Sequence, residues 1–199
     1  MKAKTWALLC ALLALTAALL TGCGSSDDDT SSASKPAGNP TDRAFVADMI
    51  PHHQSAVEMA AVAKTEATSM FVKDLAADIT RTQNAEISEM QRVDAQLAEA
   101  GITKGDLGVD GHQMGMDSSA AELRGAKPFD EKFIAMMVPH HEGAIEMARI
   151  EIDKGDNADL KKLAESIISS QERELKEMRA HLKAEGGAID EMSDEHHSG

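Results

Sequence analysis

The sequence is poor in aromatic residues, which make up only 3% of its 199 residues, and it contains no Tyr. β-Sandwiches rely on aromatic and β-branched side chains to build and fill their strands. Ala, Met, Leu, Glu and Asp are abundant instead, and this mixture favours helices. The composition therefore predicts an all-α protein.

Basic residues are also scarce. Lys and Arg number 20 against 34 Asp and Glu, so the formal net charge is −14. Binding to DNA or RNA needs clustered Lys and Arg against the phosphates, and nucleic acid is therefore excluded as a partner. Most of the acidic side chains are expected to form a solvated surface, which also attracts cations weakly.

Cysteine occurs only twice, at Cys10 and Cys23, and both positions lie near the N-terminus. Disulfide bonds and thiolate metal sites are therefore excluded from the folded part of the chain. A metal site in that part has to use His, Met or oxygen ligands.

The N-terminus has the pattern of a secretory signal. Lys2 and Lys4 precede an uncharged run over residues 6–20, and Leu-Thr-Gly then precedes Cys23. A Cys after Leu-Thr-Gly resembles the bacterial lipobox, which implies cleavage before Cys23 and lipidation of that residue. Several acyl chains would anchor the protein stably on the extracytoplasmic face of the cell membrane. The alternative is an uncleaved anchor, although the run is short for a full span.

The rest of the chain divides into a tether, a helical domain and a tail. Residues 23–40 are mostly Ser, Asp, Gly and Pro, which is typical of a flexible tether. A short helix of one or two turns fits Ser119–Arg124. The signal peptide covers residues 1–22, the helical domain residues 41–187 and a polar tail residues 188–199. The longer helices expected in this domain are Asp42–Thr65, Ser69–Ala100, Asp130–Gly155 and Asn157–Gly187.

The helical domain is an internal duplication with a shift of 88 residues, so that Phe45 corresponds to Phe133 and Pro51 to Pro139. Each copy is a helical hairpin with one apolar stripe, and two such hairpins make a four-helix bundle. Both up-down-down-up and up-down-up-down topologies fit the long connection between them. The two prolines either kink their helices or begin new ones, and the apolar spacing through them favours kinks.

Polar residues interrupt the apolar stripe of two helices. Between Leu75 and Leu97 the stripe recurs every three or four positions and includes Gln83 and Glu86, and the fourth helix repeats this with Gln171 and Glu174. A buried carboxylate without a partner is costly or becomes neutral. Partners on other helices are therefore expected.

Histidine pairs on the first and third helices are the candidate partners. Counting outward from the turn of the first hairpin puts His53 and Met49 at the level of Gln83 and Glu86. The repeat does the same in the second hairpin, so the two half-sites should meet near mid-bundle. One ring of each pair is expected to face inward, and the other to face solvent or a supporting side chain.

These side chains suit a soft or borderline metal ion. Imidazole and thioether together favour Cu(I), whereas His alone suits Cu(II) or zinc. The alternatives are core histidines hydrogen-bonded to Glu or Gln, and methionines that only fill the core. The candidate ligands are His52, His53, Met49, Met59, His140, His141, Met137 and Met147, with Gln83, Glu86, Gln171 and Glu174 as further ligands or as partners behind them.

A second set of soft ligands lies in the connection between the hairpins. His112, Met114 and Met116 fall in a glycine-rich stretch and could capture Cu(I) loosely. A plain polar loop fits the same residues.

The duplicated motif Met-X-Pro-His-His-X-X-Ala-X-Glu-Met-Ala resembles the bacterial family of domain of unknown function 305, over about Phe45 to His181. The resemblance implies a ferritin-like helical bundle that is secreted or membrane-anchored, and copper binding through His and Met in some members. The first copy departs from the commoner form, because it has Gln54 and Ser55 where the second has Glu142 and Gly143. That departure puts equal use of the two half-sites in doubt.

The sequence supports three functional hypotheses. The first is an extracytoplasmic lipoprotein that binds a transition metal, copper above zinc or iron, for buffering, resistance or handover. The second is a ferritin-like di-metal redox enzyme, although no Glu-X-X-His motif and no catalytic nucleophile are evident. The third is an envelope interaction module without metal. Self-association of the chain fits all three hypotheses.

Overall fold

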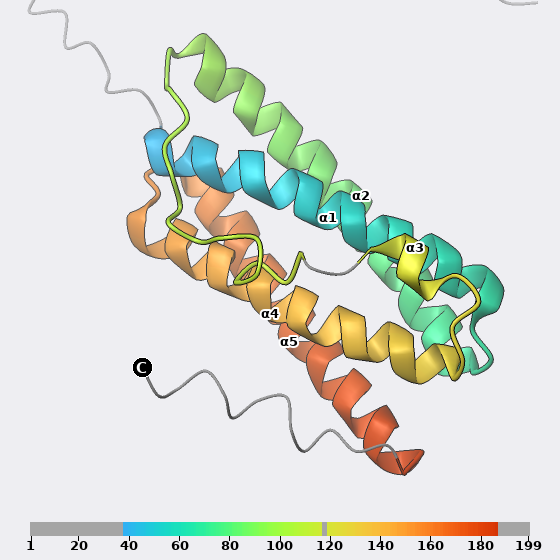
Figure 1. The fold of residues 1–199 in the computed structure, drawn as a ribbon. Coiled ribbons are helices and arrows are strands. Elements are labelled where there is room, and N and C mark those ends of the chain that lie inside the picture. Colours follow the sequence, from blue (N-terminus) through green and yellow to red (C-terminus); the bar gives the residue numbers. More distant parts are fainter. Residues whose placement is uncertain (1–37, 117–118, 187–199) are drawn as a thin grey trace, which may run out of the picture. The chain divides into compact units, whose positions relative to one another are not determined.

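The computed structural model describes residues 38–116 and 119–186, and this part of the chain is all-helical, as the composition predicts (Figure 1). Cys23, the predicted signal peptide, most of the predicted tether and the predicted polar tail lie outside the described residues. Within the described residues, none of the helices combines the length and the hydrophobicity that a transmembrane span needs. The helices are α1 (Pro40–Glu66), α2 (Met70–Glu99), α3 (Ala120–Leu123), α4 (Phe129–Lys154) and α5 (Ala158–Ala184).

Helix α1 begins two residues earlier than the sequence pattern predicts, because Asn39 is its N-cap. The Asn39 side chain accepts hydrogen bonds from the backbone N–H groups of Thr41 and Asp42. Pro40 fits the first helical position, where no N–H is needed. The Asp42 carboxylate in turn accepts from the backbone N–H of Asn39 and completes a capping box.

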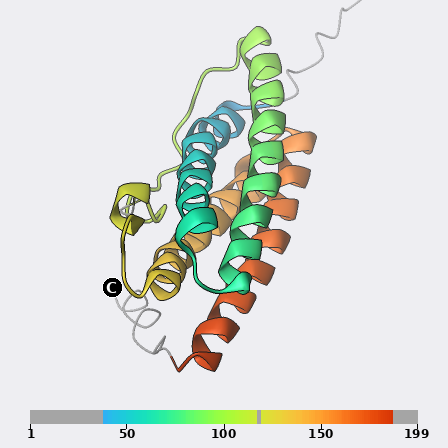
Figure 2. The ribbon, with the colours of Figure 1, turned by 90° about the vertical axis from the view of Figure 1, so that its right-hand side faces the viewer.

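Asp42 also joins the first hairpin to the second. Its carboxylate accepts hydrogen bonds from the backbone N–H groups of Asp156 (3.1 Å) and Asn157 (2.9 Å) in the turn between α4 and α5. The start of α1 therefore lies beside the end of α4, and the two helices are antiparallel. With each hairpin antiparallel as well, the topology is up-down-down-up, one of the two arrangements that fit the sequence (Figure 2).

The second hairpin makes the equivalent contact on the first. Asp130, at the start of α4, accepts hydrogen bonds from the backbone N–H groups of Thr68 (2.9 Å) and Ser69 (2.7 Å) in the α1–α2 turn. Asp130 is 88 residues after Asp42, and the two turns have the same offset. The duplication is thus visible as a pseudo-two-fold arrangement in which each hairpin binds the turn of the other.

Both prolines inside the repeated motif lie within continuous helices. Helix α1 extends through Pro51 and α4 through Pro139. The alternative that these prolines begin helices is therefore wrong. Each proline lacks the N–H that would bond to the carbonyl four residues earlier, so the backbone beside both histidine pairs is locally weakened.

The apolar core falls into two clusters that occupy separate stretches of α1, α2 and α5 and meet on α4, where Ala144 belongs to one cluster and Ile145 to the other. On α1, one cluster contains residues 44–49 and the other begins at Ala56. On α2, one cluster ends at Ile79 and the other begins at Ile87. Polar residues, all buried except the half-buried Glu86, fill the interval. We call this middle stratum the polar layer: His52, His53, Gln83, Glu86, His140, His141, Gln171 and Glu174.

Candidate metal site

The four histidines of the repeated motif are all buried in the polar layer. Their relative exposures are 1% for His52 and 0% for His53, His140 and His141. Neither ring of a pair faces solvent, contrary to one of the orientations expected from the sequence. Helices α1 and α4 pack against each other along this face, so both members of each adjacent pair are enclosed.

The first histidine of each pair meets its counterpart across the pseudo-two-fold axis. The His52 and His140 ring centroids are 3.7 Å apart, with 34° between the ring planes. His53 lies farther out, with its ring centroid 6.0 Å from that of His52. The duplication therefore brings one imidazole from each half-site into direct contact at mid-bundle.

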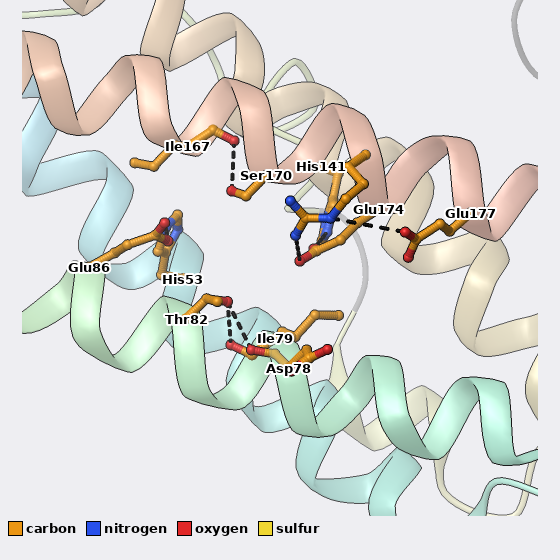
Figure 3. Close-up of polar contacts among 11 residues, drawn as sticks. His53, Asp78, Ile79, Thr82, Glu86, His141, Ile167, Ser170, Glu174 and Glu177 are labelled. Atoms are coloured by element: carbon orange, nitrogen blue, oxygen red, sulfur yellow. Dashed lines mark hydrogen bonds and ion pairs between the residues drawn. The ribbon is translucent and has the colours of Figure 1, made fainter.

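The second histidine of each pair contacts the polar-layer glutamate of its own hairpin. His53 Nε2 lies 2.9 Å from Glu86 Oε2, and His141 Nε2 lies 2.7 Å from Glu174 Oε2 (Figure 3). An ionised carboxylate only accepts, so the Nε2–H donates in both pairs. When such a ring is neutral its lone pair is on Nδ1, and neither Nδ1 has a hydrogen-bond partner. These contacts are the compensation that the buried carboxylates require.

The two histidine–glutamate pairs are not identical in their surroundings. The Glu174 side chain is 4% exposed and the Glu86 side chain 12%. Arg173 lies 3.8 Å from the second oxygen of Glu174, whereas the repeat position beside Glu86 is Ala85. The second half-site thus has a guanidinium next to its carboxylate, and the first does not.

A third hydrogen bond ties His52 to the connection between the hairpins. His52 Nε2 lies 2.9 Å from the main-chain oxygen of Met114. A carbonyl oxygen only accepts, so this ring also carries its proton on Nε2, and its Nδ1 has no partner. Neither nitrogen of His140 has a partner. Across the four rings, five buried nitrogens are therefore available for a further bond.

Burial keeps the two central rings neutral. Desolvation, followed by repulsion from the neighbouring His53, lowers the pKa of His52 to about 3. Desolvation and then repulsion from His52 lower the pKa of His140 well below its usual value. Both imidazoles are uncharged at neutral pH, and a neutral imidazole is the form that can bind a metal ion.

The candidate thioether ligands border the polar layer on both sides. All four are fully buried, and they divide between the two apolar clusters as the pseudo-symmetry requires. Met59 and Met137 belong to one cluster, and Met49 and Met147 belong to the other. Each is packed in the core as a gap-filling residue would be.

The remaining polar side chains of the layer are under-bonded. Gln83 Oε1 and both terminal atoms of Gln171 have no hydrogen-bond partner. A buried polar atom without a partner is destabilising, and such atoms usually have a functional or solvent-related reason. Within residues 38–116 and 119–186, however, no three His, Asp or Glu side chains are grouped so that they could hold a metal ion by themselves.

The connection between the hairpins reaches the site in a way that the sequence did not indicate. The methionines were predicted to act through their sulfur atoms, but Met114 contacts His52 through its main-chain oxygen. His112 is exposed, and Met114 and Met116 are half-buried. Every residue has a main-chain carbonyl, so the sequence could not predict this acceptor, although it did show that the stretch is rich in glycine.

Comparison with solved structures finds helical relatives of similar size. CopM in its Cu(I)-bound form is 32% identical, over 73% of this chain and 98% of its own, with a TM-score of 0.62. A putative secreted protein DUF305 from Streptomyces coelicolor is 26% identical over 77% of this chain and 98% of its own, with a TM-score of 0.66. A DUF305 fragment from Deinococcus radiodurans is 27% identical over 75% and 99%, with a TM-score of 0.63.

The sequence match covers the whole bundle and both half-sites. The domain of unknown function (DUF305) matches residues 42–182, from the capping aspartate of α1 to the last turn of α5. A comparison with functionally curated proteins finds no significant match. The duplicated motif, the helical bundle and the extent of this match together place the chain in the DUF305 family.

Proposed function

We propose that this protein binds a soft metal ion, copper, in the polar layer between α1 and α4, and that it buffers the ion or hands it on outside the cytoplasm. The observation that carries the proposal is the set of four buried imidazoles, each of which has at least one nitrogen without a hydrogen-bond partner. CopM, which is 32% identical, has been solved in Cu(I)-bound, Cu(II)-bound and silver-bound forms. These findings support metal binding by this chain.

The choice of copper rests on the donor set. Zinc in proteins almost always takes four N, O or S ligands, and the described residues contain no group of three His, Asp or Glu that could hold an ion. Cu(I) and Ag(I) accept fewer ligands and favour thioethers and imidazoles. A site that combines imidazole nitrogens with Met49 or Met137 suits such an ion.

The proposed roles follow the hydrogen bonds of each ring. His52 and His140 are the inner ligands, because they meet across the axis. His53 and His141 offer Nδ1, since Glu86 and Glu174 hold Nε2. A carboxylate behind a ligating histidine orients the ring and raises its basicity. Met59 and Met147, two turns farther along their helices, complete the apolar surround.

The same contacts argue against the di-metal enzyme. That mechanism needs Glu86 and Glu174 as bridging ligands, whereas both carboxylates accept from histidine here. The remaining alternative is a polar network without metal. Metal titration separates these hypotheses.

The experiment uses the mature chain with Cys23→Ser, which removes both the lipid and a thiol that would bind Cu(I). Anaerobic titration of Cu(I) against a chromophoric chelator, and parallel titrations with Ag(I), Zn(II) and Fe(II), measure affinity and stoichiometry. We expect tight Cu(I) and Ag(I) binding that is lost in the His52→Gln/His140→Gln double variant. His181→Gln is the matched control, because His181 lies outside the polar layer. Fe(II) binding with oxygen uptake and no copper binding would support the enzyme; no binding of any metal would support the interaction module.

Attachment to the membrane belongs to the same proposal. The Leu-Thr-Gly-Cys sequence supports lipidation at Cys23 and an extracytoplasmic location. Metabolic labelling with a radioactive fatty acid tests this directly. The wild-type chain should be labelled and should fractionate with membranes, whereas the Cys23→Ser variant should be unlabelled.

A further inference from the structure

One contact with the polar layer comes from outside the duplicated hairpins. Residues 110–116, which we call the 110–116 turn, lie in the connection between α2 and α3 and run across α4 (Figure 1). The turn is closed by its own backbone hydrogen bonds, from Met114 N to Asp110 O (3.0 Å) and from Met116 N to Gly111 O (2.9 Å). It therefore arrives at the site as a compact unit rather than as a loose loop.

Two glycines seat the turn on α4. A Cβ atom at Gly143 would lie 2.3 Å from the main-chain carbon and oxygen of Met114. A Cβ atom at Gly115 would lie 2.5 Å from the main-chain oxygen of Pro139, and Gly115 has a positive φ of 68°. Glycine inside a helix is unfavourable, so its presence one turn after His140 has a reason, which is the close approach of a second backbone.

The 110–116 turn supplies His52 with a hydrogen-bond acceptor for its Nε2–H, as the glutamates do for His53 and His141. The Met114 carbonyl accepts from His52 Nε2, as Glu86 and Glu174 accept from the other two rings. Three of the four histidines thus have the same tautomer, with the lone pair on Nδ1. Only His140 lacks a partner on both nitrogens.

We infer that the 110–116 turn is a working part of the metal site: its Met114 carbonyl orients His52 for ligation through Nδ1, and Gly143 is the positioning residue that lets it do so. This inference rests on the proposed metal-binding function. The turn also makes the two half-sites unequal, because the repeat position of Gly143 is Ser55. His52 is held by the turn, whereas His140 keeps the freedom to offer either nitrogen.

The test is Gly143→Ala in the full mature chain carrying Cys23→Ser. The added methyl group should lift the turn off α4 without harming the helix, since Ala is the better helix former. Gly111→Ala is the matched control, because a Cβ atom there would meet nothing within 4 Å. Gly115→Ala is a second variant that unseats the turn from its other side, and circular dichroism verifies helicity in all of them.

Two readouts need no metal. Long-range ¹H–¹⁵N NMR at pH 7 reports the tautomer of each ring, and diethylpyrocarbonate labelling with peptide mass spectrometry reports the accessibility of His52. In Gly143→Ala we expect the Nε2–H signature of His52 to be lost while those of His53 and His141 remain. Labelling of His52 should rise about five- to tenfold, the change in population expected when one hydrogen bond is lost.

A third readout, the rate of Ag(I) release to a competing chelator, separates this inference from the function on which it rests. Faster release from Gly143→Ala than from Gly111→Ala supports the inference. If the parent chain binds silver but Gly143→Ala has the tautomers, labelling and release rate of the control, the inference is overturned and the function stands. If the parent chain binds neither Ag(I) nor Cu(I), the proposed function fails, and the role of the turn in a metal site fails with it.

Discussion

Replacing Glu151 with Gln should stabilise the protein in alkaline solution. Glu151 lies near the C-terminal end of α4, is fully buried, and has no hydrogen-bond donor on either carboxylate oxygen. Burial, followed by the neighbouring Asp42 carboxyl group, raises the pKa of Glu151 from 4.5 to about 9. Asp42 is already committed to the backbone N–H groups of Asp156 and Asn157, so the two acids share a crowded site.

The sign of the pH dependence follows from this pKa. Folded Glu151 keeps its proton up to about pH 9, whereas the unfolded chain loses it near pH 4.5. Between these values the folded protein binds one proton more than the unfolded chain, so the stability that this proton contributes falls as pH rises. The Gln side chain has nearly the shape of protonated Glu and no proton to lose, and its stability should not have this slope.

The folding free energy that this proton contributes has an upper limit of about 6 kcal/mol, because each unit of difference between the folded and unfolded pKa values corresponds to about 1.36 kcal/mol. The measured effect should be smaller, because Lys161 lies in the same turn region and can approach an ionised Glu151; its Nζ is 3.2 Å from the main-chain oxygen of Gly155. We expect the advantage of Glu151→Gln to grow by about 2–4 kcal/mol between pH 5 and pH 9.

Urea unfolding followed by circular dichroism, repeated at half-unit pH steps, measures this difference. The buried histidines also lower the stability of both proteins below about pH 6.5. This contribution cancels when the unfolding free energy of the variant is subtracted from that of the parent at each pH. Glu146→Gln is the matched control, since Glu146 is exposed on the same helix. A difference that stays flat from pH 5 to pH 9, as for Glu146→Gln, would refute the reasoning.

Three further predictions concern the site and the bundle. Met137→Leu preserves core volume, so stability should change by less than about 1.5 kcal/mol, while Cu(I) affinity measured by chelator competition should drop at least about tenfold; equal affinity would make Met137 a packing residue only. Glu174→Gln should weaken Cu(I) binding about 10- to 100-fold, because His141 loses the carboxylate that orients it, and Glu172→Gln on the exposed face is its control. Asp130→Ala should cost about 1–3 kcal/mol in urea unfolding, because the backbone N–H groups of Thr68 and Ser69 lose their acceptor; an unchanged midpoint would show that the contact between the hairpins contributes nothing.

Much of the polar layer could be predicted from spacing alone. Helical periodicity put Gln83 and Glu86 on a core stripe, and equal distances from the turn put His53 at their level. The structure pairs His53 with Glu86 and repeats the pair as His141 with Glu174. Such prediction works because 3.6 residues per turn relates sequence position to both face and height along a helix.

The features that spacing could not predict all depend on contacts between distant segments. Periodicity does not say which of two adjacent histidines meets its counterpart, since both can point into a bundle whose packing angle is unknown. The Met114 carbonyl is chemically the same as that of any other residue, so only the fold shows that it meets His52. Asp42 was expected only as the first residue of a helix, and its bonds to residues 156–157 follow from the antiparallel packing of α1 and α4.

The reciprocal aspartate contacts suggest how such a chain could arise. Each hairpin supplies the acceptor for the turn of the other, which is the arrangement that two identical, separate hairpins would adopt as a symmetric dimer. In such a dimer both subunits have the same sequence, so a substitution in one half-site is also present in the other. Joining the hairpins in one chain removes this constraint, and the connection then bonds to His52 but not to its counterpart His140. Fusion thus allows the two histidines that meet at the axis to differ, since His52 is held by a hydrogen bond and His140 is not.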